Sequence, residues 1–199
     1  MVVVGSGVMG QNLSTDEGVV LFINAASTVL ALGLLIVLLA PISGAQFNPA
    51  VTLSLTITNR LRFTKLAALL PAQVLGAISG AMIANAMFDL SMIQISLKER
   101  FSLGTFLGEV IATAGLIAII LTLIARSQEK LLPIAVSAWI GSAYFFTSST
   151  SFANPAVTIG RIFSDTFAGI APSSVLPFIL AQIIGAIIGI AFSKGVSRV

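Results

Sequence analysis

The 199-residue sequence contains neither cysteine nor histidine. Without them the chain can form no disulfide, no metal site of the Cys/His type and no thiolate nucleophile. It also lacks the side chain that most often acts as a general acid or base near neutral pH. Enzyme mechanisms that depend on these groups are therefore excluded. We expect a protein that is not an enzyme and that needs neither a metal nor a cofactor.

Charged residues are also scarce. They make up 9% of the sequence, whereas 57% of the residues are hydrophobic; in a typical soluble domain about a quarter of the residues are charged. A helix needs about 20 apolar residues to cross the hydrocarbon core of a bilayer. Five apolar runs approach or reach that length, at residues 19–39, 66–88, 106–125, 132–147 and 175–192. The sequence therefore predicts an all-α membrane protein with several spans and the lipid bilayer as a partner.

The basic residues give a formal net charge of +3 but form no continuous face, so we expect no nucleic-acid partner. They lie in the short segments between the apolar runs. If the segment after the first short helix is cytoplasmic, the basic residues divide into seven inside (Arg60, Arg62, Lys65, Arg126, Lys130, Lys194, Arg198) and three outside (Lys98, Arg100, Arg161). Cytoplasmic loops are rich in Lys and Arg. This division predicts that orientation in a cell inner (plasma) membrane.

What the sequence does contain is a repeated pentapeptide, Asn-Pro-Ala-Val-Thr, at residues 48–52 and 154–158. Proline disfavours helix at the residue before it and suits the first turn of a helix. Each copy therefore predicts a short helix that begins at Asn-Pro. A second repeat, Ala-Gln-x-x-Gly-Ala, follows each copy at a similar distance, from Ala72 and from Ala181. We predict a single transmembrane domain made of two repeats, residues 1–100 and 101–199.

Three membrane crossings separate equivalent elements of the two repeats, so the second repeat should be inverted relative to the first. The two short helices then enter from opposite sides and meet near the middle of the membrane. Each helix N-terminus carries unpaired N–H groups and about half a positive charge. Two such ends would repel cations and protons, while the amides of Asn48 and Asn154 would donate to a neutral solute. This arrangement predicts a passive channel for small uncharged solutes.

The first repeat has a short beginning. By symmetry, a span matching 106–125 should precede 19–39, but residues 1–9 can form only about 13 Å of helix. We therefore expect most of the first helix to be truncated in this chain. One alternative follows directly: the chain could be a fragment that assembles without a conducting pore.

These residues resemble the major intrinsic protein family, the aquaporins and aquaglyceroporins, over almost the whole chain. Residues 43–52 are similar to the family's first loop signature, with Gln46 where His is common. Residues 154–170 are similar to a bacterial branch that has Val after the second Asn-Pro-Ala and is often linked with arsenic handling. The resemblance implies homotetramers with one pore per subunit, and water, glycerol-like polyols, arsenite or boric acid as solutes. It also implies two pore motifs, formed by Asn48, Pro49 and Ala50 and by Asn154, Pro155 and Ala156.

The resemblance further implies a selectivity filter. The family usually has Arg directly after the second Asn-Pro-Ala, but here the residue is Val157. The other filter positions implied by the family's pattern are Thr28, Ser142 with Tyr144 as a possible substitute, and Ser151. A filter of Thr, Ser, Ser and Val would be wide and polar.

Arg161 lies one helical turn after Val157 and admits two interpretations. Helical side chains lean toward the N-terminus, so its guanidinium could reach back to the filter and belong to it. It could equally form a surface ion pair with Asp165, four residues further on, which would contribute little to stability.

Glu109 is the one carboxylate deep within an apolar run, and such residues are functional candidates. In the family, a Glu of this kind resembles a structural anchor that accepts hydrogen bonds from the backbone of a re-entrant loop. In a proton-coupled secondary transporter of a small solute, it would instead carry the proton. The spans contain no His or basic residue to relay a proton, which favours the anchor.

Overall fold

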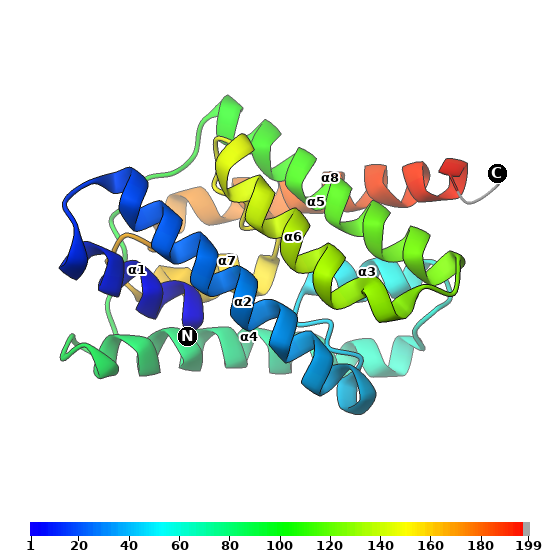
Figure 1. Cartoon of the computed structure of the whole chain (residues 1–199), viewed down its shortest axis with the longest axis horizontal. Helices are drawn as coiled ribbons and strands as arrows, with labels where there is room; N and C mark the ends of the chain where they lie inside the picture. The colour runs from blue at the N-terminus through cyan, green and yellow to red at the C-terminus, as the bar shows by residue number, and fades with distance from the viewer. Residues whose placement is uncertain (197–199) are drawn as a thin grey trace.

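The computed structural model describes residues 1–196, and these residues form helices and connecting loops. Arg198 lies outside the described residues. The long helices run side by side, and the short ones lie between them (Figure 1). The α-helices are α1 (Val2–Leu13), α2 (Glu17–Ser43), α3 (Pro49–Ile57), α4 (Phe63–Met87), α5 (Leu103–Ala125), α6 (Leu132–Phe146), α7 (Pro155–Gly160) and α8 (Pro172–Val196). The 3-10 turn η1 (Glu129–Leu131) precedes α6, and η2 (Arg161–Phe163) follows α7.

Four helices of the described chain, α2, α4, α5 and α8, have 23 to 27 residues and are long and apolar enough to cross a membrane. The 15-residue α6 covers the remaining predicted apolar run and reaches about 22 Å. The 12 residues of α1 reach about 18 Å, roughly half the length of α5. The predicted all-α membrane fold is confirmed.

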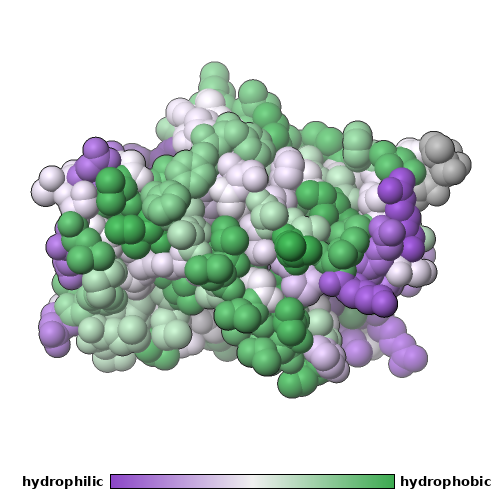
Figure 2. Space-filling view, viewed as in Figure 1, coloured by the Kyte–Doolittle hydropathy of each residue, from purple (hydrophilic) through white to green (hydrophobic). Residues whose placement is uncertain are grey.

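The outer surface of the helices is apolar. Large side chains such as Phe22, Leu30 and Leu34 on α2 are more than 60% exposed, which suits lipid rather than water as the surroundings. Figure 2 shows apolar residues across the middle of the molecule and hydrophilic residues at its two ends. Exposed basic residues lie on the α3–α4 and α5–α6 connections and near the end of α8, namely Arg60, Arg62, Lys65, Arg126, Lys130 and Lys194.

The closest long-helix packing is between α5 and α8. A Cβ atom added at Gly185 would lie 2.5 Å from the carbonyl oxygen of Val110, and one added at Gly189 would lie 2.5 Å from that of Ala114. Glycine at these positions allows the two backbones to approach, as small residues do between membrane helices. This contact holds Glu109 of α5 against α8, which positions the site described below.

Candidate functional site

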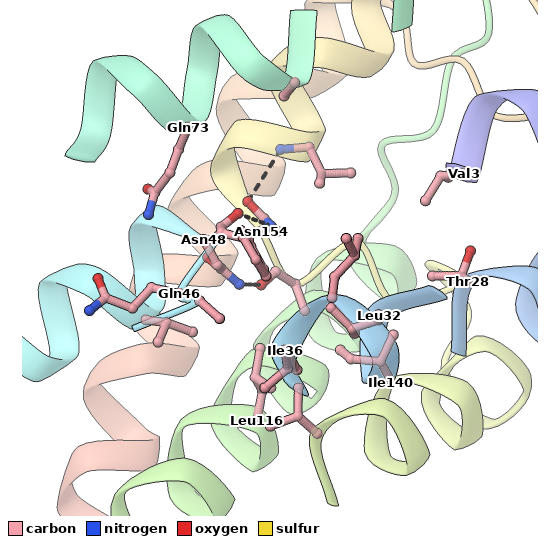
Figure 3. A pocket seen from close by; sticks show the side chains of 18 of the residues that line it. Val3, Thr28, Leu32, Ile36, Gln46, Asn48, Gln73, Leu116, Ile140 and Asn154 are labelled. Atoms are coloured by element: carbon pink, nitrogen blue, oxygen red, sulfur yellow. Dashed lines mark hydrogen bonds between the residues drawn. The ribbon is translucent and has the colours of Figure 1, made fainter. Parts of the chain in front are cut away.

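A cavity of about 690 Å³ lies between the two short helices and the long helices around them. Its lining is mixed. Leu32, Ile36, Leu116 and Ile140 form an apolar part, and the amides of Asn48 and Asn154 lie opposite them (Figure 3). Gln46 and Gln73 extend the polar part beyond Asn48 (Figure 3). A lining with one apolar and one polar side suits a small solute that carries several polar groups on a carbon skeleton.

The two Asn residues are the N-caps of α3 and α7. The side-chain oxygen of Asn48 accepts a hydrogen bond from the Ala50 N–H at 2.9 Å, and that of Asn154 accepts one from the Ala156 N–H at 3.0 Å. A proline follows each Asn at the first helical position, where a missing N–H costs nothing. These caps fix each amide with its NH₂ group turned away from its own helix.

The two short helices are joined at their N-termini. The Asn48 amide nitrogen donates to the Ala153 carbonyl at 2.7 Å, and the Asn154 nitrogen donates to the Phe47 carbonyl at 3.0 Å. Each NH₂ group has two hydrogens, so each amide keeps one N–H beyond its bond across the junction. The structure thus brings together both Asn-Pro-Ala motifs, including the buried Pro49, Ala50, Pro155 and Ala156.

The residue before each Asn has the same unusual backbone. Phe47 and Ala153 have φ values of 50° and 46°, in the left-handed region that non-glycine residues rarely adopt. Such a conformation costs about 1–3 kcal/mol and persists only where surrounding contacts hold it. The contacts that hold it differ between the two halves of the chain.

Glu109 holds the second of these loops. Its two carboxylate oxygens accept the N–H groups of Phe152 and Ala153, each at 2.8 Å. The Gln182 amide donates to the same carboxylate at 2.6 Å and to the Thr158 hydroxyl at 2.9 Å. Glu109 is fully buried and is not part of the cavity lining. Both of its oxygens are therefore occupied by the protein itself.

The corresponding contacts in the first half are neutral. The Gln73 amide donates to the Thr52 hydroxyl at 2.8 Å, and Thr52 lies 3.0 Å from the side-chain oxygen of Gln46. The repeated Ala-Gln-x-x-Gly-Ala segment thus supplies Gln73 and Gln182 to equivalent places, each bonded to the Thr of its own pentapeptide. The duplicated Gln was the sequence signal for these residues.

The positions implied for the filter divide into two groups. Thr28, Ser151 and Val157 line the cavity, and Tyr144 lies with them, with its hydroxyl 3.3 Å from that of Thr28. Ser151 is buried, and its hydroxyl has no hydrogen-bond partner within residues 1–196.

Ser142 does not line the cavity. It is exposed on the outer surface of α6, and its hydroxyl bonds to the Ala138 carbonyl at 2.9 Å. Two residues along a helix correspond to a rotation of about 200°, so Ser142 and Tyr144 lie on nearly opposite faces. The cavity therefore has an aromatic side chain at the position where the implied filter had serine.

Arg161 lies on the cavity side. It is buried and lines the cavity, its Nε donates to the Ala168 carbonyl, and its guanidinium carbon lies 3.4 Å from the centroid of the Phe152 ring. Asp165 instead accepts the Leu97 N–H at 3.0 Å, and no ion pair joins it to Arg161 within the described residues. This geometry favours the interpretation of Arg161 as a cavity residue, and it makes the lining more positive than Thr, Ser, Ser and Val imply.

The loop between α4 and α5 runs along the segment that follows α7. Its Ser96 N–H donates to the Ile162 carbonyl, and its Lys98 carbonyl accepts the Ala171 N–H, both at 2.8 Å. The Glu99 carboxylate accepts the hydroxyls of Ser173 and Ser174, and these hydrogen bonds lower the pKa of Glu99. The loop is thus bonded to the segment after α7 along its length. Sequence reasoning assigned it no role, since no motif marks it.

Comparisons with known proteins identify the family and the fold of the chain. Residues 1–151 match the family model described as Major intrinsic protein. The chain is 42% identical to Aquaglyceroporin AqpS of Rhizobium meliloti, across 96% of this chain and 82% of that protein. It is 32% identical to Aquaporin Z of Brucella melitensis, across 83% and 80%. The solved structure of the aquaglyceroporin from Plasmodium falciparum has the same fold, with a TM-score of 0.65 at 21% identity over 99% of this chain and 90% of that one.

Proposed function

The chain belongs to the major intrinsic protein family, and from this membership and the geometry of the cavity we propose that it is a passive channel for small uncharged solutes. Solutes move by diffusion down their gradient, and no chemical step is required. One observation carries the proposal: the N-termini of α3 and α7 meet at the cavity, joined by the amides of Asn48 and Asn154.

The same junction accounts for exclusion of protons and ions. Both short helices direct the positive end of their dipoles at the junction, which opposes a cation. Each Asn donates its second N–H, so a passing water molecule or hydroxyl group uses its oxygen to accept. A water oriented in this way cannot continue a chain of donors and acceptors through the junction. Neutral solutes pass this barrier because they carry no net charge.

For the solutes themselves, we propose water and glycerol-like polyols, with arsenite or boric acid as hydroxyl-rich alternatives. Support comes from the lining, in which Leu116 and Ile140 can contact a carbon skeleton while the two Asn amides donate to hydroxyl groups. Two of the similar proteins are described as aquaglyceroporins.

A proton-coupled transporter that uses Glu109 is not favoured. A proton carrier must reach the transported solute, whereas this carboxylate is buried outside the cavity and accepts hydrogen bonds from Phe152, Ala153 and Gln182. The anchor role therefore stands as our proposal for Glu109. The non-conducting alternative is opposed by the size of the cavity between the short helices.

We propose assembly as a homotetramer in a bacterial inner membrane, with one channel per subunit. The large exposed apolar side chains on the long helices provide surface for both lipid and neighbouring subunits. Native mass spectrometry of the protein in detergent tests the tetramer, and a monomer under conditions that keep a known tetrameric channel intact would contradict it.

The function is tested by stopped-flow light scattering on proteoliposomes after an osmotic jump with sucrose, glycerol or urea. We expect faster shrinkage in sucrose than in empty vesicles if water crosses, and faster reswelling in glycerol. A pH-sensitive dye inside the same vesicles should report no proton flux coupled to solute. Rates equal to those of empty vesicles for every solute would contradict the proposal.

A further inference from the structure

We infer that Arg100, in the loop between α4 and α5, is a specificity-determining residue that positions and reinforces the positive charge at the outer end of the channel. Val157 supplies no charge where the family usually has Arg. The structure assigns that task to a pair of cations, Arg161 on the cavity and Arg100 behind it. The inference rests on the proposed channel function and deepens it.

The two arginines bind one short stretch of backbone. Arg100 donates from Nε to the Gly169 carbonyl and from Nη2 to the Phe167 carbonyl, both at 2.6 Å. Arg161 donates to the carbonyl between them, that of Ala168. Three consecutive carbonyls therefore face two guanidinium groups, and the orientation of each guanidinium depends on the other.

The two arginines also share one aromatic ring. The guanidinium carbon of Arg161 lies 3.4 Å from the centroid of Phe152, and that of Arg100 lies 5.3 Å from it. Aromatic faces attract cations at such distances. Phe152 itself is buried and held by an edge-to-face contact with Phe178, with ring centroids 5.1 Å apart. Phe152 lines the channel next to Ser151. A displacement of Arg100 therefore alters the surroundings of a side chain in the channel lining.

Arginine guanidinium groups keep their proton in proteins at neutral pH, so both charges are present, and no carboxylate forms an ion pair with either one within residues 1–196. Burial lowers the pKa of Arg100 only to about 10, so the group stays protonated. The nearby carboxylates are directed at other groups: Glu99 accepts the hydroxyls of Ser173 and Ser174, Asp165 accepts the Leu97 N–H, and Glu109 accepts the N–H groups of Phe152 and Ala153. Their distances of 3.4 Å and 5.3 Å from the same Phe152 centroid place the two guanidinium carbons no more than about 9 Å apart, a separation at which charges away from bulk water are weakly screened. Arg100 and Arg161 therefore place two positive charges at the outer end of the channel, where they oppose the entry of cations.

The first test replaces Arg100 by Gln and by Lys in full-length protein in proteoliposomes. Potassium influx is read with an enclosed potassium-sensitive dye and divided by the glycerol permeability of the same vesicles, which corrects for the amount of active channel. We expect Arg100→Gln to raise this ratio about three- to tenfold. Arg100→Lys keeps the charge but cannot reproduce the forked pair of hydrogen bonds, and we expect a ratio close to wild type.

Lys98→Gln is the matched control. It removes a cation from the same loop that also donates to the Phe167 carbonyl, at 3.3 Å, and lies 4.9 Å from the Phe167 ring, whereas Arg100 in addition binds the Gly169 carbonyl and lies over Phe152. We expect less than a twofold change in the ratio. If Arg100→Gln and Arg100→Lys both raise it, attachment of the loop rather than charge is responsible and the inference is overturned. An unchanged ratio in Arg100→Gln also overturns it.

The second test uses Arg100→His and keeps the inference testable if the Gln variant does not fold. The chain has no other histidine, so the charge at position 100 can be switched between about pH 5.5 and 8 in one folded protein. The charged or titratable groups around this position are Lys98, Glu99, Glu109, Tyr144 and Arg161. We expect the potassium ratio to rise with pH in this variant and to stay flat in wild type. Equal pH profiles would overturn the inference.

The two proposals fail in different ways. A wild-type protein that passes no glycerol overturns the channel function, and the role of Arg100 falls with it. A wild type that passes glycerol, together with an Arg100→Gln variant of unchanged potassium ratio, overturns the role of Arg100 alone.

Discussion

The two Asn-Pro-Ala-Val-Thr segments are identical in sequence and nearly identical in backbone, yet the protein holds them by different means. The loop before α7 is bound by the buried carboxylate of Glu109 and lies beside Arg161. The loop before α3 is bound through the neutral chain of Gln46, Thr52 and Gln73. A pentapeptide therefore determines its own cap and helix start, while the strength of its attachment is decided by side chains elsewhere.

The surrounding helices differ in the same way. In the second half, α5 lies against α8 at Gly185 and Gly189. In the first half, a Cβ atom added at Gly80 of α4 would lie 2.8 Å from the nitrogen of Met1, the residue before α1, whereas one added at Gly76 would have no neighbouring atom within 4 Å. Gly76 instead lines the cavity. We therefore expect the second loop to be the more rigid and the more sensitive to substitution.

The largest effect should come from Glu109→Ala, which removes the acceptor for two buried N–H groups and for the Gln182 amide. An unsatisfied buried donor costs about 1–3 kcal/mol, so we expect a loss of at least about 3 kcal/mol and little folded protein. Thermal unfolding in detergent measures this. Glu109→Gln keeps one acceptor oxygen and should be less severe. A stable Glu109→Gln variant that loses proton-coupled solute flux would instead support the transporter alternative.

Asn48→Ala and Asn154→Ala should come next and should be nearly equal. Each loses an N-cap worth about 1 kcal/mol and a hydrogen bond across the junction worth about 1 kcal/mol, for a total of about 2 kcal/mol. The double variant should lose less than the sum, because the two residues join the same pair of helices. Chemical denaturation of all three proteins tests this, and strict additivity would contradict a shared junction.

The pair Gln182→Leu and Gln73→Leu compares the two anchors directly. Gln182 donates to a carboxylate and Gln73 to a hydroxyl, and hydrogen bonds to charged groups are about twice as strong. We expect losses of about 2 kcal/mol and about 1 kcal/mol respectively, measured by the shift in unfolding midpoint. An equal or reversed order would show that the second half is not the more strongly held.

The smallest effects concern α6. Tyr144→Phe removes the hydroxyl that lies 3.3 Å from Thr28, a contact worth about 0.5–1 kcal/mol, and we expect it to change the ratio of glycerol to water permeability about twofold. Ser142→Ala changes a residue on the outer surface and should leave the ratio as it is. Stopped-flow rates for both solutes provide the comparison. If the permeability ratio changed only in the Ser142 variant, the filter would lie on the Ser142 face of α6 and not on the Tyr144 face.

Much of the fold was predictable because membrane helices and half-helices leave strong local signals. Each of the five apolar runs corresponds to one helix, to within one residue at its C-terminal end for α4 and α6, and α3 and α7 begin at the predicted Asn-Pro positions. The register of α6 was less predictable. Whether residue 142 or residue 144 faces the cavity depends on the length of the loop between α6 and α7. A shift of two residues turns a side chain from the cavity to the lipid.

The contacts of Arg161 and Arg100 were also not predictable from the sequence. Sequence spacing admitted both Asp165 and the cavity as neighbours of Arg161, because each lies within reach of a long side chain. The sequence placed Arg100 outside the membrane but gave no signal for its contacts, since its partners are backbone carbonyls about 70 residues away.

The sequence by itself determined that the helices lie in a lipid bilayer, where they begin, and that two short helices form an inverted pair. These features follow from hydrophobic runs and from Asn-Pro, which act on their own segment of backbone and its nearest neighbours. Only the tertiary structure decided which polar group meets which. It placed Glu109 under the second loop, Tyr144 rather than Ser142 beside Thr28, and Arg100 behind Phe152. These contacts join segments far apart in the chain, where their partners depend on packing of the whole bundle rather than on local spacing.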